Sequence, residues 1–426
     1  MIYMASATSL FCSSLMWSGC TLDEVSEEPD PQREPVAWMF EHTEDYLAAS
    51  PTWRRERIEQ TLWQAELGYS SKMLDGYGLE QEGWELLYAY DFPVQPLAAT
   101  EAPHVRTLEF EGMPLLQNAK SKFGDDPTRW TQAQWQSFGE DVFWQMPMRK
   151  DNYFEWLLGQ PELWDDLGLS VDEMGNLRGV TRYRDIRGDV QVGMSCALCH
   201  AADGVQGRAV ERLDLGMARA KFRESRGLEA DVYAQWGAGK VDVTDDDVLD
   251  PMAIPNLWGM KYQRYFNASG VIRVETPASA AIRFETQYMM NHGYEVRAPR
   301  EYTWALAMYL YGLSEPDSEP MSDAAHRGEE VFGERCASCH VPERGYSGDL
   351  VTATALVGLD MVAATSLDRG TGSYRVPSLI GVGEGGPYFH DSSAKTLGDV
   401  LAGGHPMGGE LDEDDMSDLI LFLKTL

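Results

Sequence analysis

The sequence predicts a mainly α-helical protein in which two similar domains follow one another, preceded by a tryptophan-rich helical region. Three observations lead to this prediction. Apolar residues recur at helical spacing in several segments, the C-terminal half contains an internal repeat, and each copy of that repeat carries one C-x-x-C-H motif. The 426 residues suffice for two or three domains, and 43% hydrophobic with 24% charged residues excludes wholesale disorder.

The charge balance is strongly acidic, with 35 Lys and Arg against 68 Asp and Glu and a formal net charge of −33. Such a surface repels nucleic-acid backbones and anionic lipid headgroups, so we expect no nucleic-acid partner. It would attract a basic partner protein, although the charge could equally serve solubility alone.

The first twenty residues resemble an export leader. They lack Lys and Arg and contain the apolar run Ser9–Trp17, followed by Ser18-Gly19-Cys20. We expect residues 1–20 to be a signal or lipoprotein-type leader with lipidation at Cys20. The positively charged start is missing, which a start codon chosen too far downstream would explain, and Trp17 stands where such sites usually carry Leu. Residues 21–35 are acidic and proline-rich, which predicts a flexible tether.

Residues 36–170 form the tryptophan-rich helical region, whose role the sequence does not reveal. Apolar residues at helical spacing predict helices over 53–67 and 131–143, and Pro51 and Pro127 lie near the expected helix starts. We expect the tryptophans to be core and interface residues rather than electron relays. They are Trp38, Trp53, Trp63, Trp84, Trp130, Trp135, Trp144, Trp156 and Trp164.

Two C-x-x-C-H motifs carry the chemistry. The first is Cys196-Ala197-Leu198-Cys199-His200 and the second is Cys336-Ala337-Ser338-Cys339-His340. This spacing is typical of covalent haem c attachment, in which two thiols add to the haem vinyl groups and the histidine binds one face of the iron. A redox dithiol or a zinc site drawn from both pairs is the alternative, but neither needs a histidine behind each pair. Bacteria attach haem in this way outside the cytoplasm, which implies export a second time.

The internal repeat defines the two domains. Pro255–Met260 matches Pro377–Val382, and Tyr265-Phe266-Asn267 matches Tyr388-Phe389-His390 after a one-residue gap. Both halves end in an amphipathic helix, 300–313 and 413–426, and a gap-free superposition of these helices places His292 on His405. We therefore predict a first cytochrome c domain over 171–315 and a second over 323–426, joined by a linker near 314–322.

The two domains are expected to differ before their haem motifs. Gly328 and Phe332 predict a helix that crosses the C-terminal helix of the second domain, where Leu419, Phe422 and Leu423 offer an apolar stripe. In the first domain, residues 182–193 alternate in the manner of a strand or hairpin instead.

His292 and His405 are the expected sixth ligands of the first and second haem iron, because they occupy equivalent places in the repeat. Met290 and Met407 are the alternatives, although these two methionines do not align with each other. A thioether ligand would give a higher reduction potential than a second imidazole.

Three segments carry a family resemblance: Tyr374–Leu379, Pro387–Asp391 and Lys395-Thr396-Leu397. They resemble the second haem domain of the bacterial di-haem cytochrome c peroxidase and MauG-like superfamily, of which rubber oxygenases are distant members. The resemblance covers about residues 180–426. It implies that the second haem, with His340 proximal and His405 or Met407 distal, transfers electrons. It also implies that the first haem, with His200 proximal, is the reactive one.

The sequence departs from this superfamily between the haems. The Trp-Asp-Gly stretch is replaced by Phe266–Gly270, and the acid that would cleave peroxide has no clear counterpart, with Glu275 and Glu285 as nearby candidates. Residues expected to lie around or between the haems are Trp258, Phe266, Tyr388 and His390. If His292 binds the first iron permanently, peroxide has no site.

The expected function is that of an exported di-haem c-type cytochrome, periplasmic or in the outer cell envelope of a Gram-negative bacterium, and held to a membrane only by a lipid anchor. It would reduce hydrogen peroxide or carry out a related oxidation at the first haem, with electrons from a redox partner protein entering through the second. The alternative is pure electron transfer with both irons six-coordinate, and the sequence leaves enzymatic activity open.

Calcium is a further candidate ligand. Asp242, Asp245, Asp246, Asp247 and Asp250 form an acidic loop, but it lacks the regular glycine-containing spacing of a calcium loop, and such runs are more often solvated. The superfamily often binds calcium between its haem domains, largely through backbone carbonyls.

Overall fold

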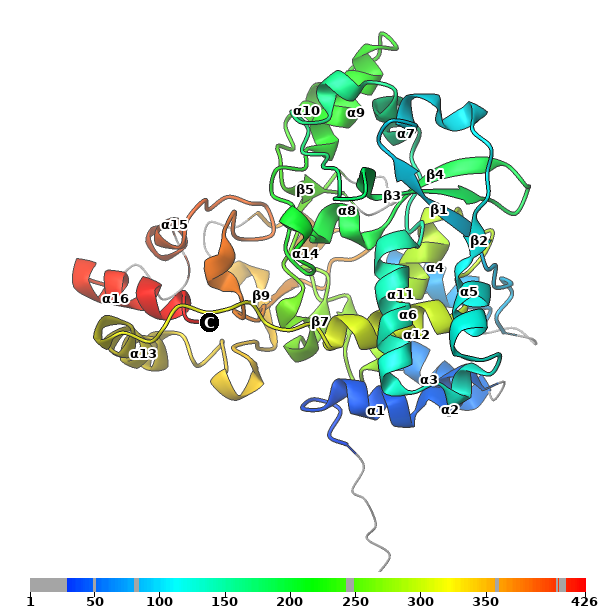
Figure 1. Ribbon diagram of the computed structural model, residues 1–426. Coiled ribbons are helices and arrows are strands. Elements are labelled where there is room, and N and C mark those ends of the chain that lie inside the picture. The colour runs from blue at the N-terminus through cyan, green and yellow to red at the C-terminus, as the bar shows by residue number, and fades with distance from the viewer. Residues whose placement is uncertain are drawn as a thin grey trace, which may run out of the picture.

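The computed structural model describes residues 29–48, 51–79, 84–242, 249–356, 360–403, 405 and 411–426. It is helix-rich, with a larger body built from the N-terminal and middle segments and a smaller C-terminal lobe beside it (Figure 1). The expected leader with Cys20, the acidic residues Asp245–Asp247 and Met407 lie outside the described residues. In the described part of the chain, no helix is long and apolar enough to cross a membrane.

The tryptophan-rich region contains seven helices: α1 (Pro35–Glu41), α2 (Thr43–Leu47), α3 (Pro51–Thr61), α4 (Gly68–Tyr77), α5 (Leu115–Phe123), α6 (Gln132–Gln145) and α7 (Asn152–Leu158). Helices α3 and α6 overlap the two segments where helices are predicted, 53–67 and 131–143, but α3 ends at Thr61, well before the predicted end at residue 67. Helix α6 begins with a capping box, in which the side chains of Thr131 and Gln134 each bond the other's backbone N–H.

One sheet joins the tryptophan-rich region to the first haem motif. Its antiparallel strands run in the order β2 (Met113–Pro114), β1 (Pro93–Ala98), β3 (Asn176–Arg184) and β4 (Val190–Met194). Strands β3 and β4 form the hairpin that the alternation over 182–193 predicts, with Thr181 opposite Gly193. The sheet therefore crosses the boundary expected near residue 171.

Two helices lie at the centre of the body, α11 (Ala278–Asn291) and α12 (Arg300–Tyr311) (Figure 1). Helix α12 packs along α6, and the side chain of Trp304 stacks on Tyr46 with 4.3 Å between ring centroids. The main core runs from Trp38 to Leu313, so the tryptophan-rich region and residues 171–313 share one core. Burial of Trp38, Trp130 and Trp135 agrees with the core role predicted for the tryptophans.

The remaining elements of the body include α8, which is formed by the first C-x-x-C-H motif. They are α8 (Cys196–His200), α9 (Leu215–Glu224), α10 (Asp231–Ala234), β5 (Lys240–Val241), β6 (Met252–Ala253), β7 (Tyr265–Phe266) and β8 (Ile272–Arg273). Five short 3₁₀ helices complete this part: Ala102–Thr107, Pro127–Arg129, Pro161–Leu163, Ala202–Gly204 and Trp258–Tyr262.

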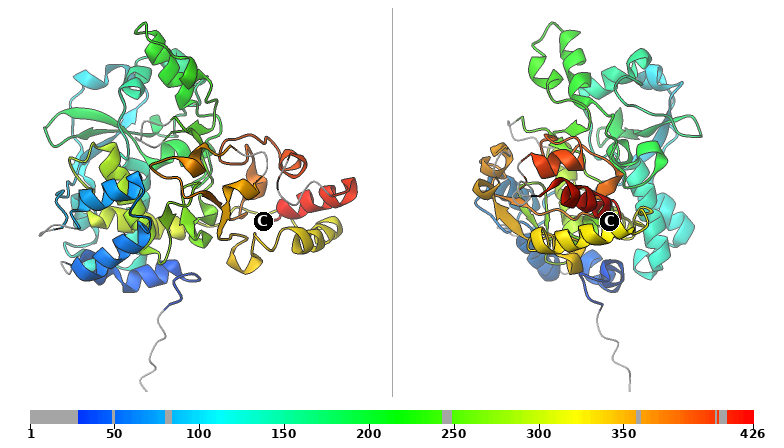
Figure 2. Two further views of the ribbon diagram at one scale, coloured as in Figure 1. Left: turned by 180° about the vertical axis from the view of Figure 1, so that it is seen from behind. Right: turned by 90° about the vertical axis from the view of Figure 1, so that its left-hand side faces the viewer.

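The C-terminal lobe has its own small core. It contains α13 (Asp323–Arg335), β9 (Leu350–Thr352), α14 (Val362–Thr365), β10 (Ser373–Arg375), α15 (Leu397–Ala402), α16 (Glu413–Leu423) and 3₁₀ helices at Pro342–Arg344, Ala353–Ala355 and Val382–Glu384. Helices α13 and α16 lie side by side in every view (Figures 1 and 2).

The predicted helix crossing in this lobe is confirmed. A Cβ atom at Gly328 would lie 2.0 Å from the carbonyl oxygen of Asp418, so only glycine permits α13 to approach α16 this closely. The rings of Phe332 and Phe422 are 5.3 Å apart, and Leu419 is buried between the helices.

Candidate haem-binding sites

The first C-x-x-C-H motif forms the short helix α8 immediately after the sheet. Gly179 of β3 has a left-handed φ of 70°, and a Cβ atom there would lie 2.0 Å from the backbone nitrogen of Leu198. Helix α8 therefore rests directly on the backbone of β3. Burial raises the pKa of the Cys196 and Cys199 thiols to about 12 and lowers that of His200 to about 4.

One nitrogen of His200 is held by a backbone carbonyl. Its Nδ1 lies 3.0 Å from the oxygen of Pro255, the first residue of the repeated Pro-x-Leu-x-Gly turn. An Nδ1–H that donates to this carbonyl leaves Nε2 as the unprotonated nitrogen, which is the form that binds a metal.

The second motif follows α13, and a backbone carbonyl also holds one nitrogen of its histidine. Nδ1 of His340 lies 3.0 Å from the carbonyl oxygen of Tyr346. Burial lowers the pKa of His340 to about 4, opposed by hydrogen bonding to the carbonyls of Tyr346 and Pro377. Pro377, the counterpart of Pro255 in the repeat, lies near His340, but the carbonyl that holds Nδ1 of His340 is that of Tyr346.

The two repeated turns pack against each other. A Cβ atom at Gly381 would lie 2.6 Å from Cε3 of Trp258, and one at Gly259 would lie 2.6 Å from Cβ of Ser378. Trp258 is buried and donates from Nε1 to the carbonyl oxygen of Gln206, 3.1 Å away. The turn that holds His200 is thus in direct contact with the matching turn of the C-terminal lobe, and Trp258 lies at this contact.

His405 lies opposite His340. Their ring centroids are 6.0 Å apart with an interplanar angle of 34°, and the ring of Phe389 stacks on His405 at 6.2 Å. Two imidazoles that bind opposite faces of one metal ion, each with a nitrogen to metal distance of about 2.0 Å, have ring centres about 6 Å apart. The spacing suits a shared iron. Its rival Met407 is outside the described residues.

His292 has a different environment from His405, although the repeat places the two histidines in equivalent positions. Its Nε2 lies 2.8 Å from the carbonyl oxygen of Pro147, and its ring stacks on Tyr288 at 4.2 Å. The reason is that His292 is the C-cap of α11 and turns into the main core beside Phe92. The structure brings it to aromatic residues rather than to His200, and Met290 is also buried in this core.

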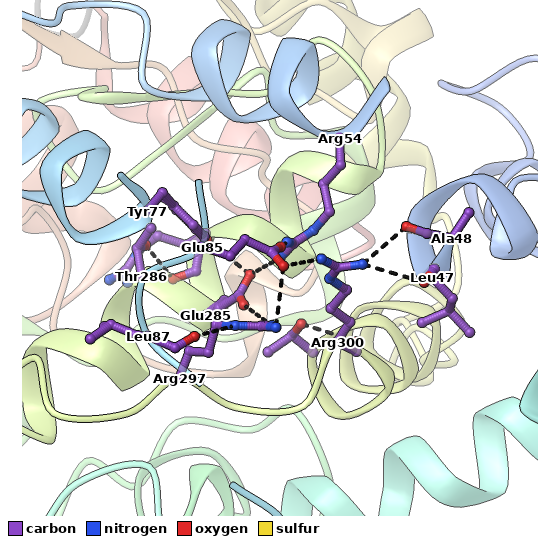
Figure 3. A network of polar contacts seen from close by, with 12 residues as sticks. Leu47, Ala48, Arg54, Tyr77, Glu85, Leu87, Glu285, Thr286, Arg297 and Arg300 are labelled. Carbon is purple, nitrogen blue, oxygen red and sulfur yellow. Dashed lines mark hydrogen bonds and ion pairs between the residues drawn. The ribbon is translucent and has the colours of Figure 1, made fainter. Parts of the chain in front are cut away.

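Glu285 belongs to a buried ionic network rather than to an open site (Figure 3). It pairs with Arg54, lies 3.3 Å from Arg297 and accepts a hydrogen bond of 2.9 Å from Tyr77. Burial alone would raise the pKa of Glu285, but the charges of Arg54 and Arg297 and the Tyr77 hydroxyl hold it below its usual value. A carboxylate fixed in its ionised form does not suit the predicted acid role.

Glu275 pairs with its neighbour Arg273 at the surface. Neither predicted acid therefore lies in a setting that suits a proton donor. Glu285 is held in buried ion pairs, and Glu275 pairs with Arg273 at the surface.

The other predicted residues lie at the boundary between body and lobe or within the lobe. Phe266 of β7 is half-buried against the main core, and the Tyr388 hydroxyl donates to the carbonyl oxygen of Val382 at 2.9 Å. His390 stacks on Tyr374 at 4.4 Å, and its carbonyl accepts a hydrogen bond from Ala253 of β6. His390 thus joins the lobe to the body.

Within the described ranges, no group of three or more His, Cys, Asp or Glu residues could hold a metal ion. The expectation of calcium at the acidic loop falls largely on residues outside those ranges. The acidic residues at its two ends, Asp242 and Asp250, are described.

Sequence reasoning missed the two proline carbonyls and the ionic network. The repeat itself was the available signal for Pro255 and Pro377, since both open the matched turn. No local pattern indicates that Arg54, Glu85 and Glu285 meet, because they come from distant segments.

The comparisons with known proteins bear on the C-terminal lobe. Residues 325–426 match the cytochrome c family model, so the chain contains a cytochrome c domain, which implies covalently bound haem c there. No curated protein sequence matches. Among solved structures, hydrazine synthase from Kuenenia stuttgartiensis, pressurised with xenon, matches with a TM-score of 0.40 and 16% identity, over 78% of this chain and 93% of that one. A TM-score this low does not establish a shared fold.

Proposed function

We propose that this protein is an exported di-haem c-type cytochrome of the di-haem peroxidase and MauG-like superfamily. One haem would be bound by Cys196, Cys199 and His200 and the other by Cys336, Cys339 and His340. It would reduce hydrogen peroxide, or carry out a related oxidation, at the first haem. The observation that carries the proposal is that each motif histidine has its Nδ1 3.0 Å from a backbone carbonyl oxygen, that of Pro255 for His200 and that of Tyr346 for His340.

The residues present fit two haems. Each motif offers two thiols and an imidazole whose Nδ1 is engaged by a carbonyl, which leaves Nε2 free to bind iron. When bound, haem c supplies one-electron redox chemistry at its iron. The family match covers the second site, and the first site rests on the matching geometry of His200 and Pro255.

His405 supports an electron-transfer role for the second site. Its ring faces that of His340 at the distance expected across one iron, and a pair of imidazoles closes both faces to small molecules. A closed iron can pass electrons but cannot bind peroxide, so the second haem would serve as the entry point for electrons.

The position of His292 favours a reactive first site over a purely electron-transferring one. His292 lies in the main core, with its Nε2 2.8 Å from the Pro147 carbonyl oxygen and its ring on Tyr288, rather than beside His200. The alternative function, electron transfer with both irons six-coordinate, would require another residue in that place.

The acidic character of the protein supports a basic redox partner. We propose a periplasmic or outer-envelope location with a lipid anchor at Cys20. We also propose that calcium binds between the two haem domains, as the resemblance to this superfamily implies.

Two measurements on the purified, exported protein test this function. Mass spectrometry should find the added mass of two haems, and a single haem or none would contradict the proposal. Electron paramagnetic resonance should show one low-spin haem and a second haem whose signal changes when peroxide is added. Two low-spin signals that ignore peroxide, with no peroxide turnover, would favour the electron-transfer alternative.

A further inference from the structure

A cavity of about 610 Å³ opens between α7, the C-terminal end of α9 and the 3₁₀ helix Ala102–Thr107. Helices α7 and α9 lie at the end of the body that is far from α13 and α16 (Figure 1). This volume suits a small organic molecule, since ligand sites in proteins typically enclose about 300–1,000 Å³. None of the residues predicted for the two haem sites lines the cavity, so it is a separate feature of the molecule.

The floor of the cavity belongs to the interior of the body. Ala102 and Val105 are buried in a core that also contains Leu157 of α7. Trp156 and Phe222 pack against this core and line the cavity. A ligand would therefore meet a wall that is already formed, and its binding would lose little free energy in ordering side chains.

The wall formed by α7 and α9 combines two aromatic rings with a cation. The ring centroids of Trp156 and Phe222 are 5.9 Å apart, and the guanidinium carbon of Arg226 lies 4.9 Å from the centroid of Phe222. Arg226 is exposed and pairs with no carboxylate of the described residues. Its N–H groups are therefore available to a ligand that rests on the neighbouring rings.

The charge of the cavity differs from that of the whole protein. Glu155 is the one acidic residue among those that line it, and both of its carboxylate oxygens bond Arg106, with 3.0 Å between Oε2 and Nη2. This pair cancels, which leaves the positive charge of Arg226. In a protein with a net charge of −33, the cavity is therefore a local place for an anion.

We propose that this cavity binds a small planar aromatic molecule that carries a carboxylate. The ring of the ligand would pack on Trp156 and Phe222, and its carboxylate would accept hydrogen bonds from the guanidinium fork of Arg226. The inference goes beyond the proposed function and does not depend on haem at either motif.

Isothermal titration calorimetry of the purified holoprotein tests the site, with a naphthalene carboxylate as the probe. Naphthalene carboxamide has the same rings without the charge, and acetate has the charge without the rings. We expect the naphthalene carboxylate to bind about tenfold more tightly than either, because each of the other two probes lacks one of the two contacts.

Arg226→Gln removes the cation from the cavity. We expect it to weaken the binding of the naphthalene carboxylate about tenfold and to leave the affinity for the carboxamide unchanged. The matched control is Arg223→Gln, which removes the same charge from the same region of α9. Arg223 lies 5.3 Å from the ring centroid of Tyr233 and does not line the cavity, so its loss should change the affinity by less than about twofold.

Glu155→Gln should have the opposite effect. It removes the negative charge from the cavity wall and releases the guanidinium of Arg106, whose side chain is already largely exposed. We expect the naphthalene carboxylate to bind about threefold more tightly to this variant. If Glu155 only maintained the shape of the wall, its substitution would weaken binding instead.

The outcomes decide each part of the inference. Equal affinity for the carboxylate and the carboxamide, or an unchanged affinity in Arg226→Gln, would overturn the recognition of a carboxylate. Inorganic phosphate that binds as tightly as the naphthalene carboxylate would overturn the role of the two rings. No binding of the naphthalene carboxylate at millimolar concentration would overturn the site itself. None of these results changes the number of haems found by mass spectrometry, so failure of this inference is distinguishable from failure of the proposed function.

Discussion

Trp258 of the body and Gly381 of the C-terminal lobe touch across the boundary between the two repeated turns. A Cβ atom at Gly381 would lie 2.6 Å from the indole, and Gly381 has a left-handed φ of 73°. The contact joins the turn that holds His200 to the matching turn of the C-terminal lobe, so the docking of the lobe depends on the absence of a side chain at one position.

The first prediction tests that contact. Gly381→Ala combines a backbone penalty of about 1–2 kcal/mol with overpacking of about 1–3 kcal/mol against Trp258. The control is Gly372→Ala, whose φ of 75° gives the same backbone penalty with no atom near the new methyl group. Urea unfolding should show a larger loss of unfolding free energy for Gly381→Ala than for Gly372→Ala. Equal losses for Gly381→Ala and Gly372→Ala would mean that the Trp258 indole moves aside with no loss of stability.

The second prediction concerns the crossing of α13 and α16. Gly328→Ala should destabilise the lobe because its methyl group would meet the Asp418 carbonyl at 2.0 Å. Gly333→Ala, on the same helix but facing open space, should instead stabilise it by about 1 kcal/mol through helix propensity. Thermal unfolding followed by circular dichroism compares them, and a stable Gly328→Ala would contradict the close approach.

The third prediction concerns the sixth ligand of the second haem. His405→Ala should convert one haem from low-spin to high-spin and allow it to bind carbon monoxide in the reduced state. His390→Ala removes a histidine that stacks on Tyr374 and should leave both spectra unchanged. An unaltered spectrum for His405→Ala would instead favour Met407 as the ligand.

The fourth prediction is that His292 does not bind a haem iron. Because Nε2 of His292 bonds the Pro147 carbonyl in the core, His292→Phe should cost about 1–3 kcal/mol of stability and leave the first haem spectrum unchanged. Chemical denaturation and electron paramagnetic resonance give the two readouts. A new high-spin signal from the first haem would restore His292 as its ligand.

The fifth prediction concerns acid stability. The pKa of Glu285 is held below its unfolded value of about 4.3, so its contribution to stability is complete above that pH and is lost as the pH falls through the lower, folded value. Glu285→Gln should lower the free energy of unfolding by about 3–5 kcal/mol at neutral pH. As the pH falls into the acidic range, the stability of this variant should decrease less steeply than that of the wild type.

The control for Glu285→Gln is Glu275→Gln, which breaks a partly exposed pair with Arg273 and should cost no more than about 1 kcal/mol. Unfolding curves between pH 3 and 7 measure both variants. Similar curves for the two would contradict the buried network.

Much of the C-terminal lobe could be predicted from the sequence because its signals are local. The small residue Gly328, the aromatic Phe332 and the stripe on α16 meet through helix geometry alone. The hairpin before the first motif also follows from local alternation, as the pairing of Thr181 with Gly193 shows. The place of His405 in the repeat made it a candidate ligand from the sequence alone.

What could not be predicted depends on contacts between distant segments. The repeat places His292 on His405, but α11 packs against α12 and α3 and its C-terminal end lies against Phe92 and Tyr183. These contacts with the tryptophan-rich region and the sheet have no counterpart in the second half, and they place His292 in the core. Glu285 looked available for proton transfer because nothing near it in sequence reveals Arg54, 231 residues earlier.

The shared core that runs from Trp38 to Leu313 sets a practical limit on dissection of this protein. A fragment that starts near residue 171 would expose the apolar faces of α11 and α12 and leave Glu285 without Arg54. The segment around the first C-x-x-C-H motif therefore cannot be excised as a self-sufficient module, whereas α13, α15 and α16 of the C-terminal lobe pack in a separate core.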